Sequence, residues 1–282
     1  MGKVFHYKLQ KSGMFCNLNH LIHACALAEE RGWDIRIRWP HGLYGPPGKN
    51  AWPLYFKPVE PEGEVVKTAK RGFVQRFKQH AIAAPRGAQL PRKYQEKYKC
   101  PDFLMPPTNT TKACRIIHQY IQLNKTLAEH IDFQVAENFP PVDQKMIGLH
   151  IRGPLRFHGG SILLSDKLGQ GHPSYPAYFA AVDKAMEDGA MIFLATDAKQ
   201  VVDEVRERYG DKVINVAKCL PDAGEPHLAK KFSPYDLGVD IIQDAWLLAR
   251  CDVFIHGNSN VANFVRCMVP NTPNIDIYGH LY

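Results

Sequence analysis

The chain lacks most of the short motifs that mark a reaction class. It has no P-loop, no G-x-G-x-x-G and no G-x-S-x-G, so kinase, dehydrogenase and serine hydrolase chemistry lose support. It also has no D-x-D triplet, which leaves a metal-bridged diphosphate site without an obvious candidate. The chemistry must therefore be read from single residues at the ends of secondary-structure elements.

Cysteine pairs and long apolar runs are also absent. The seven cysteines are scattered and form no C-x-x-C pair, which favours buried thiols over a disulfide framework or a zinc site. No apolar run approaches the ~18 residues of a membrane span. The start, MGKVFHYKLQKSG, lacks the apolar core of a signal peptide. We therefore expect a cytoplasmic protein that needs no metal.

Positive charge is concentrated in one segment. The formal net charge is +7, yet the window 65–99 holds ten Lys and Arg against Glu96 alone, so the rest of the chain sums to −2. Val65, Ala69, Phe73 and Phe77 fall four apart, which predicts an amphipathic helix with a basic outer face. This face is either simply solvated or a contact for an anionic membrane surface or an acidic saccharide. No nucleic-acid-binding motif accompanies it.

The first half of the chain predicts a loose alternation of strands and helices. We expect strands over 4–9 and 33–39, a helix over 17–31, loops over 40–61 and 81–111, and a helix over 112–130. The Pro140-Pro141 pair is the predicted linker. With 282 residues the chain can hold two domains, here 1–140 and 141–282.

The second half alternates more regularly, which indicates a parallel sheet with right-handed crossovers and an α/β, Rossmann-like domain. The predicted strands are 146–152, 190–196, 212–216, 252–256 and 274–278, and the predicted helices are 175–188, 198–209, 236–250 and 259–268. Asp236, Asp240 and Asp244 fall on a more polar side of the third of these helices.

The stretch Tyr235 to Ala262 predicts a helix, a short buried strand, a polar turn and the start of another helix. The run DVFIHG is too short for a helix, and the turn that follows delivers Ser259 or Asn260 as the N-cap of the next helix. A buried strand that ends in such a turn is where α/β proteins bind anionic ligands. The pattern predicts a nucleotide or phosphate site.

The same stretch carries a family resemblance. Leu247 to Phe264, with the pattern LLxRCDxxIHGxSNVxxF, resembles the C-terminal signature of the fucosyltransferase superfamily, which includes the rhizobial nodulation α1,6-fucosyltransferase and the protein O-fucosyltransferases. MIGLHIR (146–152) and MIFLATD (191–197) resemble two further strands of that family, in order and spacing. KSGMFCN (11–17) sits where the family has a glycine-rich loop. The resemblance implies the GT-B architecture, with two Rossmann-like domains that face a cleft.

Arg152 is the strongest candidate catalytic residue. A guanidinium at the carboxyl edge of a sheet can bind a diphosphate in a forked geometry, and the alternative is that it pairs with a carboxylate at the domain interface. The resemblance implies that Arg152 binds the diphosphate of a GDP-sugar with His150 near the nucleotide. The family usually continues with an aspartate after this motif, whereas the chain continues with Gly153 to Gly160, where Arg156 and His158 supply extra positive charge.

Other positions complete the predicted nucleotide-sugar site. Asp197 is expected to accept hydrogen bonds from a guanine edge or a ribose, or to cap the helix that follows. Ser259, Asn260 and Val261 offer helix N-terminal N–H groups to a phosphate, with a plain Ser N-cap as the alternative. Gly13 and Asn17 in the first loop would let the backbone approach the donor.

The resemblance implies inverting, metal-independent transfer of L-fucose or a related sugar from a GDP-sugar to a saccharide or glycoconjugate hydroxyl. The carboxylates considered as an acceptor-activating base are Asp166, Glu29 and Asp236. Two alternatives stay open: a transferase with a different nucleotide-sugar donor, and a binding module without turnover. Bacterial polysaccharide or lipid-linked oligosaccharide suits a basic chain at the inner membrane face, and nucleic acid is not expected as a partner.

Overall fold

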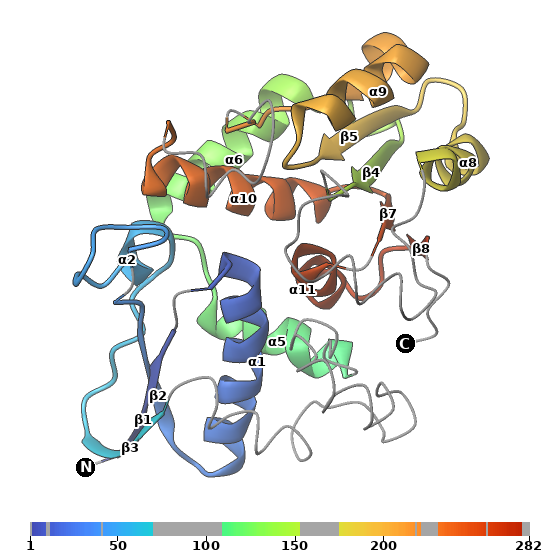
Figure 1. The fold of residues 1–282 in the computed structure, drawn as a ribbon. Coiled ribbons are helices and arrows are strands. Elements are labelled where there is room, and N and C mark those ends of the chain that lie inside the picture. Colours follow the sequence, from blue (N-terminus) through green and yellow to red (C-terminus); the bar gives the residue numbers. More distant parts are fainter. Residues whose placement is uncertain are drawn as a thin grey trace, which may run out of the picture. The chain divides into compact units, whose positions relative to one another are not determined.

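The chain is described from a computed structural model and divides into two compact units (Figure 1). The structure describes residues 2–9, 12–40, 42–69, 109–152, 175–217, 219–220, 231–257 and 259–277. Unit 1 comprises Met1–Ala128 with Cys267–Pro270, and unit 2 comprises Glu129–Arg266 with Asn271–Leu281. The boundary at Ala128 falls within a helix, whereas the sequence suggested the Pro140-Pro141 pair as the linker.

Unit 1 is built on a three-stranded parallel sheet of order β2-β1-β3. Its elements in chain order are β1 (Lys3–Lys8), α1 (Met14–Glu30), β2 (Asp34–Arg38), α2 (Trp52–Tyr55), β3 (Glu64–Ala69), α5 (Thr110–Tyr120) and the first turn of α6 (Lys125–Asn138). The predicted strand 4–9, helix 17–31 and strand 33–39 correspond to β1, α1 and β2. Helix α1 begins three residues earlier than predicted.

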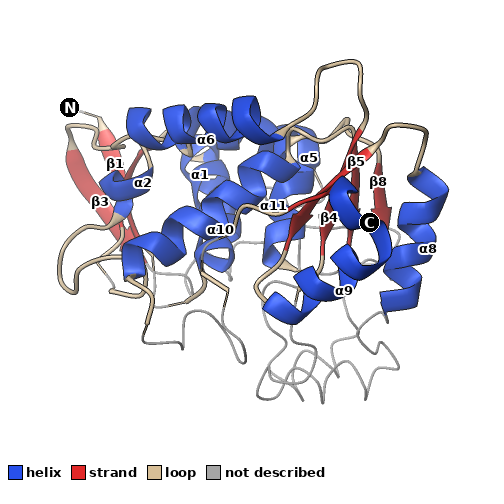
Figure 2. Cartoon of the chain, turned by 90° about the horizontal axis from the view of Figure 1, so that it is seen from above, coloured by secondary structure: helices blue, strands red, loops and turns tan. Residues whose placement is uncertain are grey.

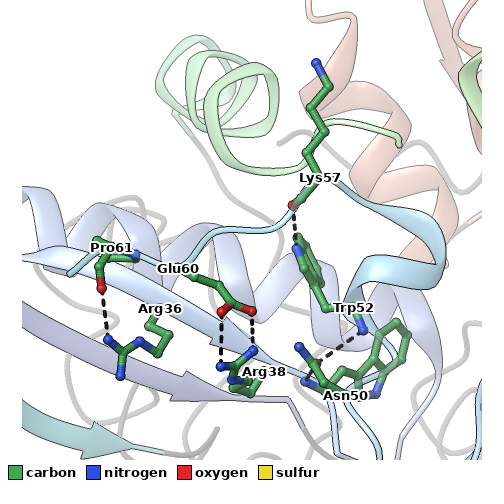
Figure 3. A network of polar contacts seen from close by, with 8 residues as sticks. Arg36, Arg38, Asn50, Trp52, Lys57, Glu60 and Pro61 are labelled. Atoms are coloured by element: carbon green, nitrogen blue, oxygen red, sulfur yellow. Dashed lines mark hydrogen bonds and ion pairs between the residues drawn. The ribbon is translucent and has the colours of Figure 1, made fainter. Parts of the chain in front are cut away.

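Hydrogen bonds shape the chain between β2 and β3, most of which is irregular as predicted. The Asn50 side-chain oxygen accepts from the backbone N–H of Trp39 at 2.7 Å and of Trp52 at 3.3 Å (Figure 3). The Trp52 indole N–H donates to the Lys57 carbonyl at 2.9 Å. These bonds connect Asn50 to the residue that follows β2 and stabilise the short helix α2, which the prediction of a loop missed.

Two helix predictions in unit 1 were wrong in part. The amphipathic helix expected from Val65 begins instead as strand β3, which pairs in parallel with β1, and the rest of the window 65–99 lies outside the described residues. The expected helix 112–130 is broken into α5 and α6 at residues 121–124. Asn124 causes the restart, because its side-chain oxygen accepts from the N–H of Leu127 at 2.9 Å as a helix cap.

Unit 2 is a five-stranded parallel sheet of order β6-β5-β4-β7-β8. Its strands are β4 (Met146–His150), β5 (Met191–Ala195), β6 (Val213–Ile214), β7 (Val253–His256) and β8 (Asn274–Asp276). Its helices after α6 are α8 (Tyr175–Ala185), α9 (Lys199–Tyr209), α10 (Pro234–Leu248) and α11 (Asn260–Met268), with a short 3₁₀ turn η3 (Gly210–Lys212). The alternation predicted for the second half is confirmed, and no end is shifted by more than three residues.

Helices α8 and α9 cover one face of this sheet, and α10 packs against the other (Figure 2). Ile147 and Leu149 of β4 and Ile151 just beyond it join an aliphatic core with α8 and α9. The residues between them, Gly148 and His150, face the opposite side, where α10 packs. A Cβ atom on Gly148 would lie 3.1 Å from both Cβ and Sγ of Cys251 and 3.2 Å from a Leu248 methyl. The absence of a side chain at Gly148 therefore lets the end of α10 approach β4.

Gly148→Ala is expected to destabilise unit 2 by about 1–3 kcal/mol, because the Cys251 and Leu248 side chains must move to admit the methyl group. Gly13→Ala is the matched control, since a Cβ there meets nothing within 4 Å and its φ is −52°. Chemical unfolding of the three proteins measures both effects. Equal midpoints for Gly148→Ala and wild type would contradict the packing argument.

Candidate functional site

The predicted site residues of unit 2 meet at the carboxyl edge of its sheet. His150, the last residue of β4, lies in register with Ala195 of β5 on one side and with His256 of β7 on the other. The chain runs outward from β4 to β5 and β6, then returns to add β7 and β8 on the opposite side. The edge between β4 and β7 is therefore a topological switch point, where open α/β sheets bind ligands.

Arg152 and Asp197 lie next to each other at this edge. The Arg152 Nη2 and Asp197 Oδ2 atoms are 4.0 Å apart, and the two side chains are 33% and 26% exposed. The alternative prediction that Arg152 pairs with a carboxylate is thus realised, but inside unit 2. Because 4.0 Å exceeds hydrogen-bond distance and the pair is partly solvated, it contributes little to stability. Such a pair suits an arginine that is oriented for an anion.

His150 is buried and neutral. Burial, the positive charge of Arg152 and the neighbouring His256 lower the pKa of His150 to about 3. Its Nδ1 atom lies 3.5 Å from the Ser259 hydroxyl. That hydroxyl already accepts from the Ala262 N–H at 2.9 Å, so its own proton is available to His150 Nδ1. This arrangement allows the tautomer with the proton on Nε2, which would make His150 a neutral donor beside Arg152.

Ser259 is the N-cap of α11, as the alternative interpretation of this residue predicted. Asn260 and Val261 form the first turn of the helix, and the Val261 side chain is buried. Only the backbone N–H of Val261 can therefore serve a ligand. The N-terminus of α11 carries partial positive charge at the same sheet edge as Arg152, so the two can act on one anion.

Asp197 does not occupy the N-cap position of α9. That position belongs to Ala198, whose N–H donates to the Thr196 hydroxyl at 3.3 Å. The capping alternative for Asp197 is therefore not supported, and its carboxylate stays at the sheet edge close to Arg152.

The acidic side of α10 was taken as its polar surface, and this was wrong for two of its three residues. Asp240 is buried and accepts from the Cys219 N–H at 2.5 Å. Asp244 is half-buried, and its Oδ1 atom is buried without a hydrogen-bond partner in the part of the chain that the structure describes. Burial and the charges of Asp240 and Asp197 raise the pKa of Asp244 well above its usual range. The spacing in the sequence places the three aspartates on one side of the helix but does not show that Asp240 and Asp244 face inward.

Gly13 and Asn17 lie at the N-terminus of α1 in unit 1. Gly13 is the N-cap residue, and the space around its Cα is open. The Asn17 side-chain amide donates to the Ser12 carbonyl at 3.1 Å and to the Gly13 carbonyl at 3.4 Å. Asn17 therefore shapes the first loop through its backbone, whatever else it contacts.

Two of the three carboxylates considered as a base have structural roles. Glu29 forms a two-pronged ion pair with Arg115, at 2.8 Å and 2.5 Å. Asp236 accepts from the Ser233 hydroxyl at 2.6 Å, while its own N–H donates back to that hydroxyl at 3.0 Å, which caps α10. Asp166 and the loop 153–160, with Arg156 and His158, lie outside the described residues.

Comparison with solved structures identifies the architecture. A structure of NodZ α1,6-fucosyltransferase with GDP superposes with a TM-score of 0.58 at 21% sequence identity, and covers 96% of this chain and 94% of that one. A NodZ structure soaked with GDP-fucose gives 0.55 at 21% identity over 94% and 92%. The chain has the GT-B fold. The predicted fold class is confirmed.

A more distant GT-B structure agrees. POFUT1 in complex with GDP-fucose superposes with a TM-score of 0.50 at 13% identity, over 98% of this chain and 97% of that chain. No known family profile matches the sequence, and no curated protein is significantly similar to it. In the described ranges, no helix has the length and apolar character needed to cross a membrane.

The neutrality of His150 predicts a pH dependence of stability. Its folded-state pKa of about 3 lies below the ordinary 6.5, so protonation of this histidine favours the unfolded state. The free energy of unfolding is therefore highest above pH 6.5 and falls as the pH is lowered toward 3. The shift corresponds to roughly 5 kcal/mol at the acid limit. Chemical unfolding from neutral to acid pH should therefore show a smaller loss of stability for His150→Asn, whose side chain does not titrate. Parallel curves for the two proteins would refute a neutral, buried His150.

Proposed function

We propose that the protein is a glycosyltransferase that moves L-fucose, or a related sugar, from a GDP-sugar to a saccharide hydroxyl. The observation that carries the proposal is the convergence of Arg152, neutral His150 and the N-terminus of α11 at one edge of the unit 2 sheet. The similar structures were solved with GDP or GDP-fucose, which supports the choice of donor.

The site residues suit the departure of a diphosphate. Transfer passes through an oxocarbenium-like transition state in which negative charge grows on the leaving group. Arg152 and the N–H groups at the start of α11 are positioned at the sheet edge to stabilise that charge, and His150 adds a neutral Nε2–H donor. We therefore propose metal-independent transfer, with inversion by direct displacement.

The carboxylates beside this edge suit a guanine base. Guanine presents N1–H and a 2-amino group side by side, and both are donors that a carboxylate can accept. Asp197 lies at the edge itself, and Asp244 lies within electrostatic range of it with a buried, unpartnered oxygen in the described part of the chain. A buried carboxylate without a partner is costly, and a donor from the ligand would relieve that cost.

The acceptor side of the proposal rests on charge. The basic window 65–99 favours an acidic saccharide or an anionic membrane surface on the cytoplasmic side, where polysaccharide and lipid-linked oligosaccharide are assembled. Glu29 and Asp236 are engaged in structural contacts, so neither is proposed as the base. A diphosphate is a good enough leaving group to reduce the need for one.

Calorimetric titration with GDP, UDP, TDP and ADP, with and without EDTA, tests the donor. We expect selective GDP binding that EDTA leaves unchanged, and a loss of about tenfold or more in Arg152→Ala because a charge-assisted contact to phosphate is removed. Arg152→Lys keeps the charge without the fork and should lie between the two. Equal binding of all four nucleotides would reject the proposal, and GDP binding without sugar transfer would favour a binding module.

Asp244→Asn separates stability from binding. The variant is expected to be more stable than wild type, because it removes a buried carboxylate that repels Asp240 and Asp197. GDP affinity should fall, since an amide accepts less strongly from guanine than a carboxylate does. Thermal unfolding and GDP titration of the same preparation measure both. A variant that is less stable, or binds GDP equally well, would contradict the assignment.

A further inference from the structure

A second histidine, His256, lies at the same sheet edge but has no part in the proposed chemistry. It is the last residue of β7 and lies in register with His150 on one side and with Asp276, the last residue of β8, on the other. Residues in register on neighbouring strands share a face of the sheet. His256 is only 1% exposed, and the Phe254 ring lies 4.6 Å from its own ring. Its position is therefore tightly defined.

The hydrogen bonds of His256 fix the chain where it leaves β7. Its Nδ1 atom lies 3.1 Å from the carbonyl oxygen of Gly257. A carbonyl can only accept, so Nδ1 carries the proton and the ring donates. The backbone carbonyl of His256 accepts from the Ile277 N–H at 2.9 Å, just beyond β8. Two consecutive carbonyls, those of His256 and Gly257, are therefore held at the start of the turn.

The surroundings keep this ring in the donating form. Burial lowers the pKa of His256, the Asp276 carboxylate, the Gly257 carbonyl and the Asn274 side chain raise it, and Arg266 lowers it. The net effect is a lowered pKa, so the ring is neutral near neutral pH and the proton on Nδ1 is the one that Gly257 accepts. Asp276 from β8 and Arg266 from α11 therefore act in opposite directions on a ring that is only 1% exposed.

We propose that His256, with Asp276 beside it, is the positioning residue of the phosphate-binding turn. Ser259 lies two residues after Gly257, and its hydroxyl both caps α11 and approaches His150. A displacement of the Gly257 carbonyl would therefore move the Ser259 hydroxyl and the first N–H groups of α11 together. His256 acts through these groups and does not touch the substrate. This inference rests on the proposed function for the identity of the ligand.

A matched pair of variants tests it. His256→Asn keeps an N–H donor close to the position of Nδ1. The leucine of His256→Leu has nearly the same shape as that asparagine but no donor. We expect His256→Asn to bind GDP almost as wild type does, and His256→Leu to bind about tenfold more weakly, the effect of one lost orienting hydrogen bond. Equal losses in both variants, with both folded, would mean that His256 only fills space, and would overturn the proposal.

A double-mutant cycle separates positioning from general damage. If His256 acts through Ser259, the losses of GDP affinity in His256→Leu and Ser259→Ala should not add. The reason is that Ser259→Ala removes the hydroxyl that His256→Leu displaces. Combination with Arg152→Ala is the control, since Arg152 follows β4 and is not part of the turn, so its loss should add to that of His256→Leu. Additive losses in the Ser259 cycle would contradict the inferred route.

A measurement without ligand keeps this test independent of the GDP-sugar proposal. The Ala262 amide is the one capped by Ser259, so its hydrogen exchange reports on the turn. Exchange should be about tenfold faster in His256→Leu than in His256→Asn. If no variant binds GDP but this difference is seen, the donor assignment fails and the positioning role stands. If the exchange rates are equal, the positioning role fails even where GDP binds.

Discussion

The register between β4 and β7 is the constraint on which the candidate site depends, and Asp252 sets it. The Asp252 carboxylate accepts from the Met146 N–H at 2.7 Å, while the Asp252 N–H donates to the Met146 carbonyl at 2.9 Å. This pair of bonds joins the starts of the two strands. Because the strands then run in parallel, His150 must end opposite His256. A shift of β7 by one residue would turn the His256 ring toward the aliphatic face.

The sheet thus keeps its polar groups on one face and its aliphatic groups on the other. Ile147, Leu149 and Ile151 pack against α8 and α9, where any polar atom would lose its hydrogen bonds to water. The opposite face holds His150, and Asp244 on α10 lies in the same half of the chain with a raised pKa. Burial keeps His150 neutral and disfavours the charged form of Asp244. Groups with shifted pKa values are common at functional sites, since a bound ligand can supply the hydrogen-bond partner that the protein does not.

Low sequence identity with the NodZ structures is consistent with the shared GT-B fold. The fold requires alternation of buried strands and amphipathic helices, which many sequences satisfy. Residues such as Gly148 and Asp252 are more restrictive, because one leaves room for the end of α10 and the other fixes a register. Both lie within the segments that resemble the fucosyltransferases, so part of that signature is structural rather than catalytic.

Local signals along the chain suffice to predict the α/β class, the strands of the second half, and the positions of Arg152, His150, Asp197 and Ser259 at strand ends or a helix start. These signals are periodicity and capping residues. The sequence by itself could not determine that β3 is a strand rather than a helix, because Val65 and Ala69 suit both and only pairing with β1 decides. Nor could it show that Asp240 and Asp244 face inward, that Asp236 bonds the Ser233 cap of its own helix, or that Glu29 pairs with Arg115. Those outcomes depend on which elements pack together, and that information exists only in the tertiary structure.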